Sequence, residues 1–287
     1  MRFAYYPGCV GKSSAAEVDH ATRRLAARLG IELVELDQAS CCGATQGWVT
    51  DPSLTLALNA RTLAQAEGLG LDVLTICNTC YLSFTRTISR LSHPGELARV
   101  NHALGAIGLQ YQGRARVRPL PAVLLEDVGA ADLRRQTRRP LEGLRIAPFY
   151  GCHLLRPAPA LGADDGRSPH WLEDLFVALG AEAVDHPAKT QCCGFHILMT
   201  NEPLGARIDA RVLQSARAAG AACVGTPCTQ CYVTLDAFQK AAERESRTRF
   251  PLPILHVAEV AGIALGLSGR DLRLSSHMVS PRSLGLV

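Results

Sequence analysis

The 287-residue sequence lacks both a long apolar segment and a strong net charge. Its first residues, MRFAYYPGC, contain no apolar run of the length of a signal peptide. The most apolar helical candidate, Leu252–Leu267, is short for a membrane span and carries His256 and Glu259. A formal charge of +4 is too small to indicate nucleic-acid binding. We therefore expect a cytoplasmic protein with no membrane span and no nucleic-acid partner.

The composition is otherwise that of an ordinary globular protein, with 47% hydrophobic and 20% charged residues. The length allows one large or two medium domains. The unusual feature is a set of eleven cysteines. Structural disulfides are rare in the cytoplasm, so metal binding is the leading interpretation of these thiols.

Ten of the cysteines form one pattern that occurs twice. The first quintet is Cys9, Cys41, Cys42, Cys77 and Cys80. The second quintet is Cys152, Cys192, Cys193, Cys228 and Cys231. In each quintet 34 residues separate the adjacent pair from the CxxC pair, and the last four cysteines share one offset of 151 residues. The flanking segments RFAYYPGC and LRIAPFYGC also match, which indicates two duplicated domains.

Hydrophobic periodicity predicts alternating strands and helices in both halves. In the first half we expect strands at Arg2–Tyr6, Ile31–Leu36 and Val73–Ile76 and helices at Ala15–Leu29, at Leu54–Glu67 and from Cys77 onward. In the second half we expect strands at Arg145–Tyr150, Ala183–Val184 and Ala222–Gly225 and helices at His170–Leu179 and Leu204–Ala219. This alternation predicts an α/β fold with a parallel sheet in each half. Sites in such sheets lie beyond the carboxyl ends of the strands, where all the cysteine groups fall.

The domain boundaries follow from the repeat. We expect a first domain at 1–133, a second at 144–267, and a linker at 134–143, where RRQTRRPLEG is polar and basic. The remaining tail, 268–287, has weak periodicity and is expected to be either loose or held by a partner.

Five thiols per half exceed the four that zinc or an ordinary cubane cluster requires. Two adjacent thiolates fit poorly on one tetrahedral ion, but they can reach two irons of a larger cluster. Gly43 and Gly194 follow the adjacent pairs and allow the backbone to turn tightly there. The apolar flanks Tyr5–Pro7 and Phe149–Tyr150 limit water around the sulfurs.

The doubled Cys…Cys-Cys-Gly…Cys-x-x-Cys pattern resembles the duplicated CCG domain of the B-type subunit of heterodisulfide reductase, over essentially the whole chain. The resemblance implies two Rossmann-like CCG domains related by a pseudo-twofold axis. It also implies that each quintet binds a noncubane [4Fe-4S] cluster, and that the protein cleaves or forms a disulfide between the two clusters. The implied partners are a C-type subunit with conventional [4Fe-4S] clusters and a flavin-bearing A-type subunit.

The substrate is the point at which this sequence departs from the methanogen enzyme, which acts on the mixed disulfide of coenzymes M and B. A composition rich in alanine, arginine and leucine indicates a GC-rich, bacterial genome. It favours the version that resembles the subunits of bacterial sulfur oxidisers, which implies a lipoate-binding protein as the substrate carrier. The alternative within redox chemistry is a subunit that only relays electrons for a lactate or glycerol-phosphate oxidising system or for a fumarate reductase.

Three less specific interpretations of the motifs stay open. Zinc explains the CxxC pairs but not the fifth thiol, and it would make the protein a scaffold without redox activity. A thioredoxin-like dithiol at Cys77/Cys80 or Cys228/Cys231 leaves the other matched cysteines without a role. The segment Gly11-Lys12-Ser13 resembles the end of a phosphate-binding loop, but the glycine that should begin the loop is replaced by Tyr6.

Several other side chains are candidates for the site. His153 and His196 follow cysteine groups and are predicted either to donate protons or to hydrogen-bond at a cluster rim. Lys12 is predicted either to attract an anionic substrate or to be solvated, and Cys223 to be a buried structural thiol rather than a sixth ligand. A basic group is either a docking face or a solvated linker surface; it comprises the arginines at 114, 116, 118, 134, 135, 138 and 139.

Overall fold

The structure of the protein is a computed structural model that describes residues 1–157 and 164–286. The first half contains, in chain order, β1 (Arg2–Tyr6), α1 (Gly8–Gly11), α2 (Ala16–Arg28), β2 (Glu32–Glu35), α3 (Ala44–Thr50), α4 (Pro52–Gly68), β3 (Val73–Thr75), α5 (Asn78–Leu91), α6 (Pro94–Gly105), β4 (Val117–Pro119), α7 (Leu120–Ala122), the π-helix η1 (Val123–Gly129) and α8 (Ala130–Gln136). The second half contains β5 (Arg145–Pro148), α9 (Trp171–Ala178), β6 (Glu182–Ala183), α10 (Phe195–Leu198), α11 (Glu202–Ala218), β7 (Cys223–Thr226), α12 (Thr229–Ala237), α13 (Gln239–Ser246), β8 (Ile254–His256), α14 (Val257–Ala264) and two short 3-10 helices, η2 (Leu274–Ser276) and η3 (Pro281–Leu284).

Each half has one four-stranded sheet with the same strand order. The order is β2-β1-β3-β4 in the first half and β6-β5-β7-β8 in the second, and every pairing is parallel. The predicted α/β class and the duplication are therefore confirmed. In this order the chain reverses its direction of winding between β1 and β3, where ligands bind in open parallel sheets.

Matching local signals begin the long helix of each repeat. Asp51 caps α4 by accepting from the Leu54 N–H at 2.9 Å, and Asn201 caps α11 by accepting from the Leu204 N–H at 3.1 Å. Both helices carry proline in the first turn, where no intrahelical N–H bond is lost. The two helices are therefore equivalent elements of the two repeats.

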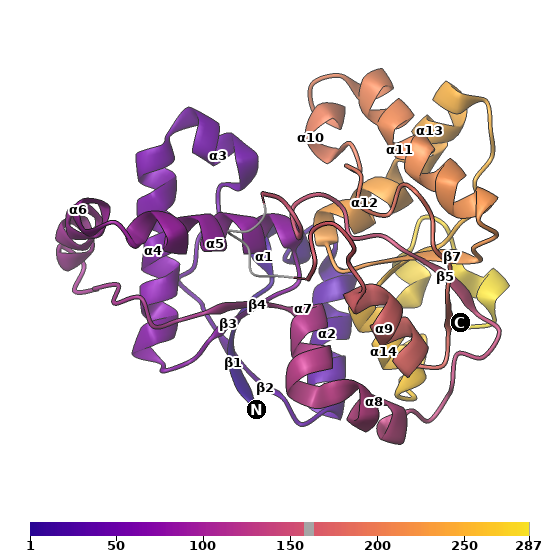
Figure 1. The fold of residues 1–287 in the computed structure, drawn as a ribbon, viewed down its shortest axis with the longest axis horizontal. Helices are drawn as coiled ribbons and strands as arrows, with labels where there is room; N and C mark the ends of the chain where they lie inside the picture. Colours follow the sequence, from indigo (N-terminus) through magenta and orange to yellow (C-terminus); the bar gives the residue numbers. More distant parts are fainter. Residues whose placement is uncertain (158–163, 287) are drawn as a thin grey trace.

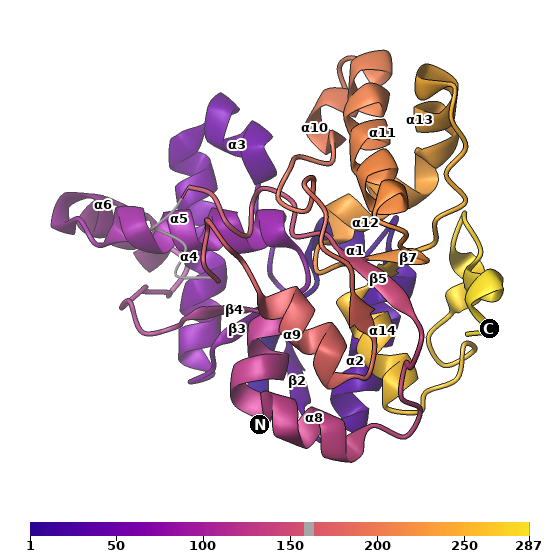
Figure 2. The same cartoon turned by 45° about the vertical axis from the view of Figure 1, so that its right-hand side comes forward.

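The two halves exchange their last helices across the molecule. Helix α14 of the second half packs against α2 of the first, and α7 and α8 of the first half pack against α9 of the second (Figures 1 and 2). Because α8 runs to Gln136, the first three residues of the predicted linker are helical. One hydrophobic core cluster includes residues from both halves, such as Leu25 and Val260.

Two expectations outside the cysteine loops were wrong. The apolar segment Leu252–Leu267 is not one helix, because its first part forms the buried edge strand β8 before α14 begins. Within the described residues, no helix has the length and apolarity that a membrane crossing requires. The tail is not loose either. Asp236 accepts from the Met278 and Val279 N–H groups, and Arg139 donates to the Gly285 carbonyl.

Candidate metal centre

The first quintet gathers at the carboxyl edge of the first sheet. Cys9 follows β1, Cys41 and Cys42 lie between β2 and α3, and Cys77 and Cys80 begin α5 after β3. The Cys41 and Cys9 sulfurs are 3.7 Å apart, and those of Cys42 and Cys80 are 3.5 Å apart. The structure therefore brings together residues that are up to 71 positions apart in the sequence.

Neighbouring thiols of each quintet are in hydrogen-bonding contact, and the order of contacts is the same in both halves. In the first half the contacts run in the order Cys9, Cys41, Cys42, Cys80 and Cys77. In the second half they run in the order Cys152, Cys192, Cys193, Cys231 and Cys228. The two lines meet where the Cys228 thiol contacts Cys77, so the ten sulfurs form one continuous line across the seam.

The first cysteine of each adjacent pair has a strongly lowered pKa. Hydrogen bonds from Cys42 and Cys9 lower the pKa of Cys41 to about 2, and hydrogen bonds from Cys152 and Cys193 lower the pKa of Cys192 to about 2. The N–H groups of Gly43 and Gly194 reinforce this by donating to these sulfurs. A hydrogen bond to the neighbouring sulfur raises the pKa of Cys42 and Cys193 to about 12. The first adjacent cysteine of each quintet therefore favours the thiolate, the form that binds metals, and a hydrogen bond from Cys228 lowers the pKa of Cys77 in the first quintet as well.

Two glycines allow the backbone to approach the second sulfur of each CxxC pair. A Cβ on Gly8 would lie 2.9 Å from the Cys80 sulfur, and one on Gly151 would lie 3.0 Å from the Cys231 sulfur. Both glycines also have a left-handed φ, at +76° and +67°. Because no other residue fits both conditions, each Gly-Cys step packs the backbone of its glycine against the CxxC pair of the same half.

The glycines after the adjacent pairs lie beside the long helix of each repeat. Gly43 and Gly194 adopt left-handed φ values of +78° and +88°, so the predicted tight turns are present. Their missing Cβ atoms would collide with Thr55 of α4 and with the Gly205 carbonyl of α11. These turns are thus crowded by the long helix of each repeat.

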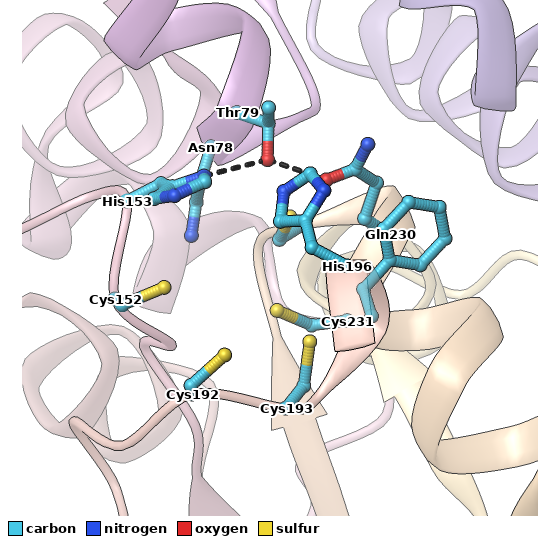
Figure 3. A pocket seen from close by; sticks show the side chains of 11 residues that line it. Asn78, Thr79, Cys152, His153, Cys192, Cys193, His196, Gln230 and Cys231 are labelled. Carbon is cyan, nitrogen blue, oxygen red and sulfur yellow. Dashed lines mark hydrogen bonds between the residues drawn. The ribbon is translucent and has the colours of Figure 1, made fainter. Parts of the chain in front are cut away.

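A polar network fills the seam between the quintets. The Thr79 hydroxyl donates to Gln230 Oε1 at 2.5 Å, so the His153 Nδ1–H donates to Thr79 Oγ1 at 2.9 Å (Figure 3). Gln46 Nε2 donates to His196 Nδ1 at 3.0 Å, and the two histidine rings lie 5.6 Å apart. Burial lowers the pKa of both histidines, which favours the neutral rings at neutral pH.

This network borders a small cavity of about 20 Å³ that all five thiols of the second quintet line. The predicted residues His153 and His196 thus lie at the second quintet, as expected. Lys12 does not join them, because it lines a different cavity, beside Cys9 and Cys41 of the first quintet. The histidines' proton-donating role and the substrate-attracting role of Lys12 stay predictions.

The remaining predicted residues lie away from the thiol line. Cys223 is buried within β7, and burial alone raises its pKa to about 12, which fits a structural thiol. The basic residues lie in the first half and in the linker, and three of them, Arg116, Arg118 and Arg135, form ion pairs with Asp72, Glu126 and Asp132. Such pairs favour the solvated surface over a docking face.

Sequence reasoning missed the residues that hold the loop at Cys42. Asn59 Nδ2 and the Ser83 hydroxyl both donate to the Cys42 carbonyl, at 3.1 and 2.7 Å, and Trp48 Nε1 donates to Ser83 at 2.8 Å. Polar residues on the buried face of α4 and α5 were the available signal, because a buried polar group requires a partner.

The donor set fits a multi-iron cluster in each half. Among the described residues, no group of three or more His, Cys, Asp or Glu side chains is arranged as ligands around a single ion. The thiols instead form lines of contacts, and thiolates are the usual ligands of iron–sulfur clusters. Zinc, which needs tetrahedral ligands around one point, fits this arrangement less well.

Comparisons with known proteins agree with this donor set. Residues 3–85 and 146–236 match the CCG family, described as a cysteine-rich domain. The chain is 37% identical to the 8-methylmenaquinol:fumarate reductase membrane anchor subunit of Wolinella succinogenes, covering 99% of both chains. It is 30% identical to the B-type subunit of the ferredoxin:CoB-CoM heterodisulfide reductase of Methanosarcina mazei, covering 97% of this chain and 94% of that one.

A likeness to a solved structure supports the fold alone. A crystal structure of a hypothetical protein from Helicobacter pylori superposes with a TM-score of 0.80 at 17% identity, covering 97% of this chain and 52% of that one. The chain thus spans about half the length of that protein.

Proposed function

The chain belongs to the family of cysteine-rich CCG-domain proteins, and we propose that it is the iron–sulfur subunit that relays electrons in a multi-subunit reductase. The observation that carries this proposal is the continuous line of ten thiols. The line begins at the exposed Cys9 and Cys41, crosses the seam at Cys77 and Cys228, and ends at the half-buried Cys152 and Cys192.

Each quintet would hold one noncubane [4Fe-4S] cluster through its five thiols. Such a cluster supplies one-electron transfer when it is bound. The protein's own contribution is to hold the two thiol sets in direct contact at the seam, while buried Tyr6 excludes water from the sulfurs of the first quintet. Electron relay benefits from a short, rigid separation between the two cluster sites. The hydrophobic core shared by both halves provides this rigidity.

The closed seam favours a relay over a disulfide-cleaving site. A disulfide would have to enter between the quintets, but Thr79 and Gln230 hydrogen-bond across this space and Cys77 contacts Cys228. The relative with 37% identity, named as part of a fumarate reductase, supports a complex of that type. In that case the partners are the donor-side and acceptor-side subunits of such a complex.

Disulfide chemistry is the second candidate, and a specific observation favours it. His153 and His196 line the cavity at the second quintet, where a ring N–H could donate a proton to the sulfur that leaves a cleaved disulfide. The relatives named as B-type subunits of heterodisulfide reductases, or as similar to them, support the same chemistry. The predicted C-type and A-type subunits and the lipoate-binding carrier belong to this candidate.

Metal and acid-labile sulfide analysis tests the iron–sulfur assignment. Protein purified without oxygen should contain about eight irons per chain with equal sulfide. Cys223→Ser is the matched control, because this thiol lies outside both quintets and its loss should leave the iron content unchanged. Zinc without sulfide would overturn the assignment.

Thiol release separates the two candidates. Dithionite-reduced protein is mixed with the coenzyme M–coenzyme B disulfide or with an oxidised lipoyl protein, and free thiols are counted. A relay predicts no release beyond the reaction with dithionite alone, whereas release in proportion to the protein would support the second candidate. Purification with its natural partners and measurement of quinol-dependent fumarate reduction provides the positive test of the relay.

A further inference from the structure

Two thiols of the first quintet, Cys9 and Cys41, border a large open cavity. This cavity of about 400 Å³ is lined by Cys9 and Cys41 together with Tyr5, Tyr6, Leu36, Ala39, Lys12 and Ser40. Its size lies in the range of small-molecule sites, which are mostly apolar with a few polar groups. It shares no lining residue with the cavity at His153 and His196, so the two cavities are separate.

The polar groups of this cavity that remain free can donate hydrogen bonds. Among the described residues, the Lys12 ammonium has no ion-pair or hydrogen-bond partner, and the buried Ser40 hydroxyl has no hydrogen-bond partner. The Tyr5 hydroxyl is already bonded to Asp19, and the Tyr6 hydroxyl donates to the Ser40 carbonyl. No carboxylate of the described residues lines the cavity. A fitting ligand must therefore present acceptor oxygens on an apolar body.

In the described part of the second half, buried leucines take the place of the free lysine. Counted from the Gly-Cys step, Leu155 occupies the position of Lys12, and both Leu154 and Leu155 are buried. Nearby Lys189 is not free, because it forms ion pairs with Glu173 and Asp185. Among the described residues, the unpaired lysine three positions after the Gly-Cys cysteine is thus particular to the first half.

We propose that the cavity beside Cys9 and Cys41 binds the head group of a quinone. Tyr5, Tyr6 and Leu36 form walls for the flat apolar ring, and Lys12 and Ser40 supply donors for its carbonyl oxygens. The inference rests on the proposed relay function and on the relative whose name identifies menaquinol as the substrate of its complex. It places the quinone at the exposed end of the thiol line.

The test measures menadione binding to the anaerobically purified, iron-loaded protein by equilibrium dialysis. Lys12→Met keeps the length of the side chain but removes the charged donor, so affinity should fall about tenfold. Ser40→Ala should weaken binding by a smaller factor. Lys240→Met on α13 is the matched control and should bind menadione like the wild type, because this lysine does not line the cavity.

The readouts separate this inference from the function on which it rests. Lys12→Met should retain wild-type iron content and electron paramagnetic resonance, because Lys12 is not among the thiol ligands. Iron-loaded protein that does not bind menadione, or that binds it equally well without Lys12, overturns the quinone site and leaves the relay standing. Lys12-dependent binding of glutathione disulfide in place of menadione also overturns it. Protein without iron would instead refute the proposed function.

Discussion

The two quintets have the same contacts among their thiols but different surroundings. Cys9 and Cys41 are exposed, whereas their counterparts Cys152 and Cys192 are half-buried. The duplication has therefore preserved the metal-binding order of sulfurs while the walls diverged. Because solvent exposure and nearby hydrogen bonds set cluster potentials, two centres with equal ligands are expected to differ in potential and access.

The residues beside the thiols show where the halves diverged. Val10 follows Cys9 where His153 follows Cys152, and Thr45 occupies the position equivalent to His196. The connection between the first two cysteine groups is also longer in the second half, at 39 residues against 31. The two rings border the second quintet, whereas the first remains open to the cavity at Lys12.

The largest expected effect comes from removing one thiol of an adjacent pair. Cys42→Ala and Cys193→Ala should each lower the iron content from about eight to about four per chain, because each removes a ligand from one quintet only. Electron paramagnetic resonance should then lose a different signal in each variant, since the surroundings differ. An unchanged spectrum would refute the ligand assignment, and loss of all iron in either variant would show that the quintets do not load independently.

A smaller effect should follow when the Gly-Cys steps receive a methyl group. Gly8→Ala and Gly151→Ala force a Cβ to 2.9 and 3.0 Å from the CxxC sulfurs, so each should lose iron from its own half and lower the melting temperature. The left-handed φ alone costs about 1 to 2 kcal/mol. Gly143→Ala and Gly70→Ala are matched controls, because they share φ values of +76° and +67° but no atom lies within 4 Å of the added Cβ. Iron loss equal to that of the controls would show that sulfur contact is not the cause.

The sequence was sufficient for features that repeat along the chain. Three strands in each half end before a cysteine group, so the period of the apolar residues and the 151-residue offset together located both quintets. The bounds of α4 and α11 differ from expectation by one or two residues because their caps, Asp51 and Asn201, precede the apolar pattern.

Contacts between the halves were beyond sequence reasoning. The Thr79–Gln230 bond and the packing of α14 on α2 depend on how two sheets are placed, which local periodicity does not encode. The open cavity at Lys12 was missed for the same reason, since a space is defined by several segments. The tail was misjudged because His277, which contacts Glu259 and helps to hold the tail in place, has no periodic apolar neighbours in the sequence.

The seam itself can be tested with one methyl-for-hydroxyl exchange. Thr79→Val leaves Gln230 Oε1 and the His153 ring without their partner, so the free energy of unfolding should fall by about 1 to 3 kcal/mol. Thr85→Val on the same helix removes a hydroxyl that bonds only its own backbone, and it should change stability by less than about 0.5 kcal/mol. Equal stability of both variants would mean that the hydrogen bonds across the seam do not hold the halves together.

The smallest expected effect concerns the tail, which only the second half carries. His277 Nε2 lies 2.9 Å from Glu259 Oε1, and neither side chain is exposed. Burial alone would lower the pKa of His277, but the charge of Glu259, helped by Asp236 and Glu17, raises it above the usual 6.5. Its stabilising contribution is therefore complete below pH 6.5 and is lost as the pH rises through the higher pKa of the folded state.

Hydrogen exchange of the Met278 and Val279 amides measures this loss, because both N–H groups donate to Asp236 beside the histidine. Their protection should decrease on the alkaline side of pH 6.5, and His277→Gln should remove this dependence. His102→Gln on α6 is the control and should retain it. Protection that stays constant with pH in the wild type would mean that the charge of the His277 imidazole does not stabilise the tail. The tail would then be held by the Asp236 hydrogen bonds and apolar packing, without a contribution from the ion pair.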